Sequence, residues 1–396
     1  MKCLALSAKS VHAEGEASQL NTSGVIISSF VYPRSFPFGV NNHVLVSRSR
    51  CIFENLALEQ WLYEHVEFPA GCPGLLLMWW NDPAVVIGRH QNPWIECSVT
   101  NAADLGVRLA RRNSGGGTVY HDLGNLNCCF MGHKEDYNRK NNLTAICNAL
   151  HTFWKVRAAI SDRDDILVQD AFKISGTAAK ISHNTAYHHC TILVDVNITV
   201  LHQVLGTIFK NFESKATASV RAPIRNLKDI CPHITLEGLS ETIGRAYNRC
   251  FSTGTDSQRT LEPTEDRFPG IEATKQQLLS WDWVFGMTPR FTVYDSFQVP
   301  PHLFSGVDIG DSLHHAVLKI SIMVYHGKLE DVRFTPHLRS QSLESTIKTS
   351  LRGVRFLQDD IRTVFLQLAS SDDEDTLRLL KFVGSSICAV VGNACR

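Results

Sequence analysis

Hydrophobic positions along the chain follow two different spacings, which predict a mixed succession of helices and strands. Between residues 51 and 66 the apolar residues recur about every fourth position, as on one side of an amphipathic helix. The continuous apolar run at 75–80 predicts a buried strand, and 84–88 is expected to return along it after the turn at 81–83. Further helices are predicted at 96–105, 143–156, 201–209 and 239–250, and further strands at 107–111, 164–168, 172–176, 178–181 and 188–194.

The pattern changes beyond residue 290. Residues 316–325 alternate between apolar and polar, 326–328 form a turn, and 329–334 return, as in a β-hairpin. Two amphipathic helices at 343–351 and 359–368 and a last helical segment follow. A polar connector at 252–267 and a helix ending at 280 precede this region. We therefore expect a separate α+β domain at the C-terminal end.

Composition and charge narrow the class of protein. Of the 396 residues, 44% are hydrophobic and 20% are charged, as in ordinary globular proteins. Lys plus Arg equals Asp plus Glu, 39 each, so no global field attracts nucleic acid or an anionic membrane. The 12 cysteines include no CxxC pair, which argues against zinc and a disulfide framework and favours buried thiols in a reducing compartment. No run reaches the roughly 18 apolar residues of a membrane span.

The first 50 residues differ from the rest of the chain. They are rich in Ser, Val and Asn, carry several basic residues and contain only Glu14 and Glu16 as acids. A basic, acid-poor start is typical of a presequence for mitochondrial import, which we place at residues 1–48. The alternative is a plain disordered tail.

A glycine-rich stretch is the first candidate for a functional site. Gly115, Gly116 and Gly117 remove three side chains in a row, so a ligand can lie against the main chain there. The surrounding residues predict a strand, the glycine loop, a strand, a tight turn and another strand. No lysine follows the glycines as in a phosphate loop, and the stretch is not a GxGxxG opening a helix. The alternative is a flexible surface loop.

Lys173 is the second candidate. It is flanked by apolar residues at the end of a predicted strand, where an ammonium could lie against a carbonyl or phosphate oxygen beside the glycine loop. The alternative is a strand lysine whose charged end reaches solvent. Candidate clamps for phosphate or carboxylate groups, each otherwise a solvated surface charge, are Arg89, Arg111, Arg112 and Arg163.

Histidines offer two weaker candidates. His188 and His189 precede Cys190, but neighbouring strand residues point to opposite faces, so we expect no metal site. His121 and Asp122 could be an acid–base pair, although an aspartate that binds the amides of its own turn is the favoured interpretation. No Ser-His-Asp or Cys-His arrangement is evident from the spacing.

Three motifs give the chain a resemblance to a known family. The sequence RRNSGGGTVYHD at 111–122, with GNLN at 124–127, resembles the first motif of the lipoate–protein ligase A family. KISGTA at 173–178 resembles the second, which holds the essential lysine of the family, and WDWVFGMTP at 281–289 the third. YHHCT at 187–191 and ATAS at 216–219 look more narrowly like the mitochondrial lipoyltransferases of this family. The resemblance runs from about residue 50 to the C-terminus.

The resemblance implies a fold and a set of site residues. It implies an α/β (α+β) protein: a large catalytic domain at 49–290 that binds lipoyl-adenylate, with a mixed sheet flanked by helices, and a small accessory α+β domain at 291–396. Lys173 would be the catalytic residue. The lipoyl-AMP site would comprise Gly115, Gly116, Gly117, Tyr120, Arg163, Lys173, Thr191, Thr217 and Ala218. Further candidates are Arg112, Ser114, His121, Asp122 and Asn125.

The resemblance also implies an activity. A transferase would move a lipoyl or octanoyl group from lipoyl-AMP, or from the lipoylated H protein of glycine cleavage, to a lysine on the lipoyl domains of 2-oxoacid dehydrogenase E2 subunits in the mitochondrial matrix. It would hold no tight cofactor and no metal. Position 173 and its neighbours contain no cysteine, unlike the related octanoyltransferases, which use a cysteine nucleophile. The alternatives are a complete lipoate ligase using ATP and Mg²⁺, a non-catalytic protein that binds lipoyl-AMP and, more weakly, a biotin ligase.

Overall fold

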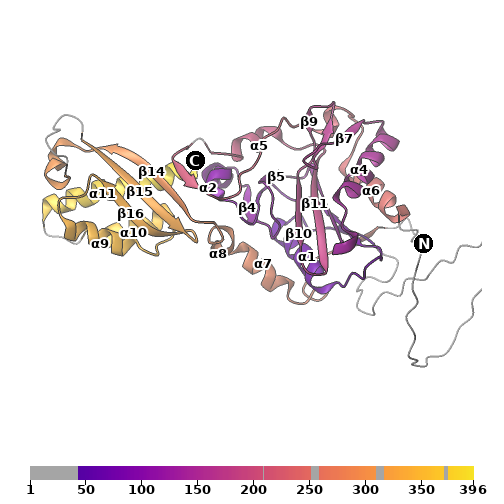
Figure 1. Ribbon diagram of the computed structural model, residues 1–396, viewed down its shortest axis with the longest axis horizontal. Helices are drawn as coiled ribbons and strands as arrows, with labels where there is room; N and C mark the ends of the chain where they lie inside the picture. The colour runs from indigo at the N-terminus through magenta and orange to yellow at the C-terminus, as the bar shows by residue number, and fades with distance from the viewer. Residues whose placement is uncertain (1–42, 208, 251–257, 309–315, 370–372) are drawn as a thin grey trace, which may run out of the picture.

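The computed structural model describes residues 43–207, 209–250, 258–308, 316–369 and 373–396. Two bodies lie side by side along the longest axis of the molecule (Figure 1). The larger contains the glycine stretch and Lys173, and the smaller contains most of the chain beyond residue 290. The C-terminus lies at the junction of the two, where Ser98 Oγ is 3.5 Å from the carbonyl oxygen of Cys395.

The larger body is built on a six-stranded mixed sheet, as expected. In spatial order the strands are β10 (Thr177–Ile181), β11 (Thr185–Leu193), β6 (Asn125–His133), β2 (Leu75–Trp79), β1 (Val44–Ser47) and β13 (Arg259–Leu261). Strand β1 is parallel to both of its neighbours, and the other pairs are antiparallel. The sheet therefore combines both directions.

Helices cover both faces of this sheet because its central strands are apolar on both sides. Leu75 and Leu77 of β2 pack in one cluster with helix α1 (Ile52–His65), whereas Leu76 and Met78 pack in another with α4 (Arg139–Trp154) and α6 (Leu236–Cys250). This is the alternation of a strand buried on two faces. Helix α7 (Ile271–Leu279) packs beside α1.

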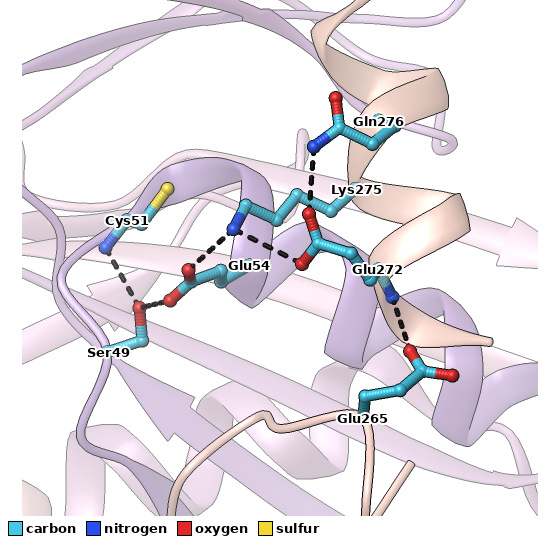
Figure 2. Close-up of polar contacts among 7 residues, drawn as sticks. All are labelled: Ser49, Cys51, Glu54, Glu265, Glu272, Lys275 and Gln276. Carbon is cyan, nitrogen blue, oxygen red and sulfur yellow. Dashed lines mark hydrogen bonds and ion pairs between the residues drawn. The ribbon is translucent and has the colours of Figure 1, made fainter. Parts of the chain in front are cut away.

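An ion-pair network fastens α7 to the start of α1 (Figure 2). Lys275 Nζ lies 3.0 Å from Glu54 Oε1 and 3.3 Å from Glu272 Oε2. Ser49 Oγ in turn donates to Glu54 Oε2 over 2.6 Å. These groups are partly exposed, so we expect the network to fix the position of α7 more than to stabilise the fold.

Two small sheets carry the candidate site. One contains β3 (Ala84–Ile87) between β4 (Arg108–Arg111) and β5 (Val119–His121), and the other β7 (Ala158–Ile160), β8 (Ile166–Val168) and β9 (Phe172–Lys173).

The prediction that 84–88 returns along 75–80 was wrong. Asn81 is buried and hydrogen-bonds Asn55 and His121, so the chain turns inward and leaves the large sheet. The predicted hairpin of 164–168 with 172–176 is confirmed by the antiparallel β8–β9 pair.

Three short helices depart from their predicted bounds. The helix expected at 96–105 is divided into α2 (Pro93–Glu96) and α3 (Val99–Asp104), because Cys97 is extended and the Ser98 side chain caps the second helix. Helix α5 (Ile198–Val204) begins earlier than expected, at a cap formed by Asn197, and ends before 209. Single 3₁₀ turns lie at Lys134–Asp136 and Leu227–Asp229, and a longer 3₁₀ helix lies at Pro301–Gly306.

The smaller body packs helices on a four-stranded antiparallel sheet. The strands are, in order, β12 (Phe212–Ser214), β14 (Phe291–Gln298), β15 (Val317–Tyr325) and β16 (Lys328–Thr335). The predicted hairpin of 316–325 with 329–334 is confirmed by the β15–β16 pair. The helices are α9 (Gln341–Leu351), α10 (Gln358–Leu368) and α11 (Glu374–Cys395). Edge strand β12 comes from within the large-domain range, and α8 (Trp281–Val284) precedes the junction.

Helix α11 is long and apolar enough to cross a membrane by length and composition alone. No other helix of the described residues passes that test. Of its most apolar window, 56% is buried, and Val383, Ile387 and Val391 belong to the core of the smaller body. Such burial is that of a core helix in an α+β domain.

The two chain segments expected to lack structure each contain a strand. Strand β1 is buried although it lies within 1–48, so the fold begins before residue 49; the rest of the expected presequence, 1–42, lies outside the described residues. The connector at 252–267 contains strand β13, which pairs with β1 and was not predicted from the sequence. Strand β13 has only three residues, Arg259, Thr260 and Leu261. With a single aliphatic side chain among them, no alternation of apolar and polar positions is visible.

Candidate active site

A cavity of about 720 Å³ lies between the β5, β9 and β11 strands, helix α5 and residues 205–224. Its wall is mixed, with apolar side chains such as Leu193 and Leu205 beside the polar groups of Glu96 and Lys173. Of the predicted site residues, it brings together Tyr120, Lys173, Thr191 and Ala218. The volume is that of a pocket for a small organic ligand.

Lys173 is held in place by main-chain and side-chain contacts. Its amide donates to Pro223 O over 2.8 Å, and its carbonyl accepts from Arg225 N over 3.2 Å. Its Nζ lies 2.8 Å from Asp165 Oδ1, with the two side chains 22% and 16% exposed. The ammonium is therefore fixed by a carboxylate at the cavity wall, which sequence reasoning missed.

A second, much smaller cavity of about 20 Å³ lies inward of the first. Val119, Gly176 and Thr191 line both cavities, so the two cavities are adjacent at these residues. A Cβ on Gly176 would lie 3.2 Å from Val119 Cγ1 and 3.3 Å from Thr191 Oγ1. A side chain at position 176 would therefore crowd the wall that the two cavities share. The inner cavity is also lined by Arg112, His121 and His189.

Buried polar side chains surround the inner cavity. His189 Nδ1 lies 2.9 Å from Glu59 Oε2, and its Nε2 is 3.3 Å from Asn127 Oδ1. Burial alone would raise the pKa of Glu59, but the contact with His189 lowers the pKa below its ordinary value. Burial, His189 and Arg112 together hold the pKa of His121 well below its ordinary value, so that its ring is neutral. Glu59 and Asn127 were missed, although a glutamate in an apolar helix was a usable signal.

The two arginines before the glycines brace the backbone. Arg111 is fully buried and donates to the carbonyls of Gly88 (3.1 Å), Gln91 (2.9 Å) and Val284 (2.9 Å), and to those of Arg89 and Trp283 and the Thr288 hydroxyl. Burial, Arg89 and Arg112 lower its pKa to about 9. The third motif therefore serves as a partner of Arg111, and Trp283 Nε1 returns a bond of 2.8 Å to Arg111 O.

Arg112 holds the glycine loop itself. Its guanidinium donates to Gly115 O and Gly117 O, both over 2.7 Å, and to Val86 O over 2.9 Å. Burial lowers its pKa to about 10, and Tyr187 and Glu59 act in the opposite direction. Arg112 also lines the inner cavity, so it both braces the loop and faces that space.

Backbone conformation and packing explain two of the three glycines, Gly116 and Gly117. Gly116 has φ +90°, a backbone conformation that favours glycine. Gly88 packs against it so closely that a Cβ added to Gly88 would lie 2.1 Å from Gly116 O. A Cβ on Gly117 would lie 3.1 Å from Ser219 Oγ, whereas Gly115 has open space. The glycines do not line either cavity. They shape the wall from behind.

The remaining predicted residues fall into two groups. Thr217 lies on residues 215–222, which we call the cover loop, and its exposed side chain stands beside Ala218 in the cavity wall. Arg163 is exposed on the turn before β8 and does not line either cavity, and Arg89 binds Asn113 Oδ1 outside the wall. These two arginines are not brought to the cavity.

The turn after β5 is structural. Asp122 accepts from the amides of Gly124 and Asn197, both over 2.8 Å, which agrees with the favoured interpretation of that aspartate. Ser114 and Asn125 are buried beside this framework, and neither line the large cavity. Asn125 has no hydrogen-bond partner for its side-chain amide among the described residues.

Metal and thiol chemistry have no visible centre in the described part of the chain. No group of three His, Cys, Asp or Glu residues there could hold a metal ion, and His188 and His189 face opposite sides of β11 as expected. The ten cysteines whose side chains the structure describes are free, and none of them lines either cavity. Burial raises the pKa of Cys128 and Cys129 well above the ordinary value. Thiolate nucleophiles are therefore disfavoured at this site.

Comparison with known proteins identifies the family. A family model described as the lipoyl protein ligase A/B catalytic domain matches residues 51–248. The mitochondrial lipoyl amidotransferase LIPT1 of Homo sapiens is 36% identical over 320 residues, which cover 80% of this chain and 82% of that protein. LIPT1 of Mus musculus is 40% identical over 316 residues, 79% of this chain and 82% of the relative. Lipoate-protein ligase A of Bdellovibrio bacteriovorus is 31% identical over 329 residues, covering 82% and 91%.

A solved structure agrees with this result. The crystal structure of P. falciparum LipL1 in complex with lipoate matches with a TM-score of 0.53 and 26% identity, covering 87% of this chain and 99% of that one. The chain therefore belongs to the lipoate–protein ligase A family. It is an enzyme of protein lipoylation that acts on lipoyl groups by transfer or by ligation.

Proposed function

We propose that the protein is a lipoyltransferase that moves a lipoyl or octanoyl group to the specific lysine of the lipoyl domains of 2-oxoacid dehydrogenase E2 subunits. The observation that carries this proposal is the Lys173 ammonium, fixed by Asp165 at the wall of a cavity of about 720 Å³. The donor is lipoyl-AMP or the lipoylated H protein. Similarity to lipoyl amidotransferases, along most of both chains, supports transfer as the activity.

The proposed ligand lies along the two cavities. The acyl chain runs from Lys173 past Gly176 and Thr191, where the two cavities are adjacent, toward His121, and widens the inner cavity as it enters. The adenylate occupies the outer cavity beside Tyr120, under the cover loop with its Thr217 and Ala218. Gly115, Gly116 and Gly117 support the wall, with Arg112, Ser114, Asp122 and Asn125 behind it. Arg163 reaches the adenylate from its exposed turn when the ligand is bound.

The proposed reaction is a direct acyl transfer. The neutral amine of the acceptor lysine attacks the acyl carbonyl carbon, a C–N bond forms, and the bond to the AMP phosphate oxygen breaks. AMP leaves with the bonding pair, and the amine loses its proton to solvent. The Lys173 ammonium stabilises the negative charge that develops on the carbonyl oxygen. With no cysteine in the cavity wall, the mechanism needs no covalent intermediate on the enzyme.

We further propose a mitochondrial matrix location, with residues 1–48 as the import segment apart from β1. Two relatives whose names place them in mitochondria support the location. Residues 49–290, extended by β1, form the catalytic domain, and 291–396 the accessory domain. The protein holds no tight cofactor in this proposal, and Mg²⁺ accompanies ATP only if the chain also activates free lipoate.

The catalytic assignment is tested by Lys173→Ala. We expect this variant to lose transfer from lipoyl-AMP to an isolated E2 lipoyl domain by about 10²-fold or more, because the charge on the carbonyl oxygen is no longer stabilised. Lys134→Ala is the matched control, since Lys134 is exposed and does not line either cavity. Mass spectrometry of the acceptor measures the transfer. Full activity in Lys173→Ala would overturn the assignment.

A donor panel separates the alternatives. One E2 domain is incubated with the enzyme and lipoate plus ATP and Mg²⁺, or lipoyl-AMP, or lipoylated H protein. We expect modification with the second and third donors only. Modification with the first, together with pyrophosphate release, would show a complete ligase instead. Binding of lipoyl-AMP without transfer from any donor would favour a non-catalytic binding protein.

A further inference from the structure

Gln91 is a fully buried amide between the glycine stretch and the cover loop. Its Oε1 accepts from Gly88 N over 2.9 Å and from Thr118 Oγ1 over 2.8 Å. Its Nε2 donates to Ser219 Oγ over 3.0 Å and to Thr217 O over 3.3 Å. One side chain thus binds the glycine stretch with its oxygen and the cover loop with its nitrogen.

Ser219 completes the contact from the cover loop. Its hydroxyl oxygen accepts from Thr118 N over 2.8 Å, and its own amide donates to Glu96 Oε1 over 3.2 Å. Gly117 leaves the space that this hydroxyl needs, because a Cβ there would lie 3.1 Å from Ser219 Oγ. Residues 215–222 form no helix or strand, and their one main-chain hydrogen bond within the described part of the chain joins Thr217 N to His90 O over 3.3 Å, so side-chain contacts contribute much of what holds them.

Gln91 lies behind the residues that line the large cavity. Glu96, Thr118 and Ser219 line the large cavity, whereas Gln91 does not. Gln91 can therefore influence a ligand only through the residues that it holds, which are Thr118 on one side and the cover loop on the other. It shares that location behind the wall with Arg111, which binds the Gln91 carbonyl over 2.9 Å.

We propose that Gln91 is a positioning residue that latches the cover loop over the acyl-adenylate through Ser219. The proposal rests on the proposed function, since it takes lipoyl-AMP as the ligand beneath the loop. A closed loop keeps the activated acyl group away from water until an acceptor lysine enters. The latch governs how long the adenylate stays bound, and Lys173 governs the chemical step.

Ser219→Ala tests the latch, because it removes the shared hydroxyl and leaves the bonds of Gln91 to Gly88 and Thr118 intact. Two partly buried hydrogen bonds are lost, so we expect lipoyl-AMP to dissociate about tenfold faster and its KM to rise about tenfold. Gln91→Met, of similar shape, is expected to raise the dissociation rate and the KM by a similar factor. Its kcat at saturating lipoyl-AMP stays within about twofold, since the Gln91 side chain does not line the cavity and Lys173 and Asp165 are unchanged.

Ser182→Ala is the matched control, because that exposed hydroxyl also bonds a carbonyl, Thr185 O over 3.0 Å, but lies outside the cavity wall. A KM in Ser219→Ala equal to that of the control would overturn the latch, as would a fall in kcat with KM unchanged. Because Ser219 lines the cavity and Gln91 does not, an unchanged KM in Gln91→Met beside a raised KM in Ser219→Ala would show a direct contact of Ser219 with the ligand and would also overturn the latch. If Gln91→Met melts at a lower temperature, both variants are measured well below that temperature. A wild-type enzyme that uses lipoylated H protein but neither binds nor uses lipoyl-AMP would overturn the latch alone, whereas one that transfers from neither donor would overturn the proposed function together with its latch.

Discussion

The pairing of Lys173 with Asp165 sets the charge at the site. A lysine that stabilises a carbonyl oxygen must keep its ammonium within about 3 Å of one point, and a long flexible side chain does not do this unaided. Asp165 supplies the fixed partner at 2.8 Å, and Asp165 is held by a turn in which Ser161 Oγ accepts from its amide over 3.1 Å. In the proposed mechanism this carboxylate orients the cation and takes no part in bond making.

Asp165→Asn is expected to lower kcat by about ten- to a hundredfold, because the ammonium loses its fixed position while its charge remains. The neighbouring Asp164→Asn is a close control, since Asp164 pairs with Arg139 over 2.9 Å and not with Lys173. Transfer of the lipoyl group from saturating lipoyl-AMP measures the difference between the variants. Equal kcat values for the two variants would show that Asp165 does not position Lys173.

Sequence reasoning at the residue scale located Lys173 but not what surrounds it. Lys173 could be singled out because its charge stands in an apolar strand. Asp165 could not, because a carboxylate eight positions earlier contacts it only through the β8–β9 hairpin and its turn. Gln91 lay in a polar loop without a pattern of its own. Side-chain roles that depend on a partner distant in the sequence leave no periodic pattern from which they could be predicted.

Strand β11 shows how one element serves two functions through its two faces. His189 faces Glu59 and the inner cavity, whereas His188 faces helix α4, where its ring stacks on Phe130 at 6.0 Å and lies 3.4 Å from Asn142 Nδ2. Burial and the charge of Arg139 lower the pKa of His188 to about 3. The neutral ring therefore belongs to the packing of α4 on the sheet.

This burial predicts a pH-dependent stability. The pKa of His188 falls from 6.5 in the unfolded chain to about 3 in the folded one, so its contribution is complete above pH 6.5 and is lost as the pH falls toward 3. His188→Phe should reduce the slope of unfolding free energy against pH in that range by up to about 1.4 kcal/mol per unit. Urea unfolding from pH 4 to 7 measures this slope. The exposed His183→Phe should leave it unchanged, and an unchanged slope in His188→Phe would contradict the prediction.

At the element scale, long periodic segments were predictable and short ones were not. Helices α1, α4 and α6 have enough turns for an apolar stripe to show, and the β15–β16 hairpin has a clear alternation. Strand β3 was assigned to the wrong sheet because a short apolar run is compatible with pairing to β2, as predicted, and equally with pairing to β4 and β5, as observed. What decides its place is the buried Asn81, whose hydrogen bonds to Asn55 and His121 form only in the folded chain.

The whole molecule is held together by residues that cross between its two bodies. Arg111 does not itself cross, but it binds the loop at Gly88 and Gln91 to the carbonyls of α8 and so fixes, within the larger body, the segment that leads into β14. Strand β12 adds the edge of the smaller sheet by pairing with β14. The smaller body is therefore connected to the cavity wall by main-chain contacts, although none of its residues beyond 290 lines the cavity.

Trp94 is the strongest of these connections. It begins in α2 of the larger body, yet its fully buried ring lies in the core of the smaller one, with ring centroids 5.2 Å from Phe285, 5.3 Å from Phe291 and 5.1 Å from Phe356. Removing such a ring costs about 3–5 kcal/mol. This cost weakens the contact between the two bodies. We therefore expect the bodies to unfold independently of each other, each at the temperature set by its own core.

We therefore expect one cooperative unfolding transition in the wild type and two separate transitions in Trp94→Ala. Calorimetry resolves them, and unfolding with and without lipoyl-AMP assigns them, because a ligand of the larger body raises only the transition of that body. The exposed Phe153→Ala is the control, since its ring lies on the surface of the larger body. A single transition in Trp94→Ala, merely shifted to lower temperature, would show that β12 and the segment fixed by Arg111 suffice to couple the two bodies.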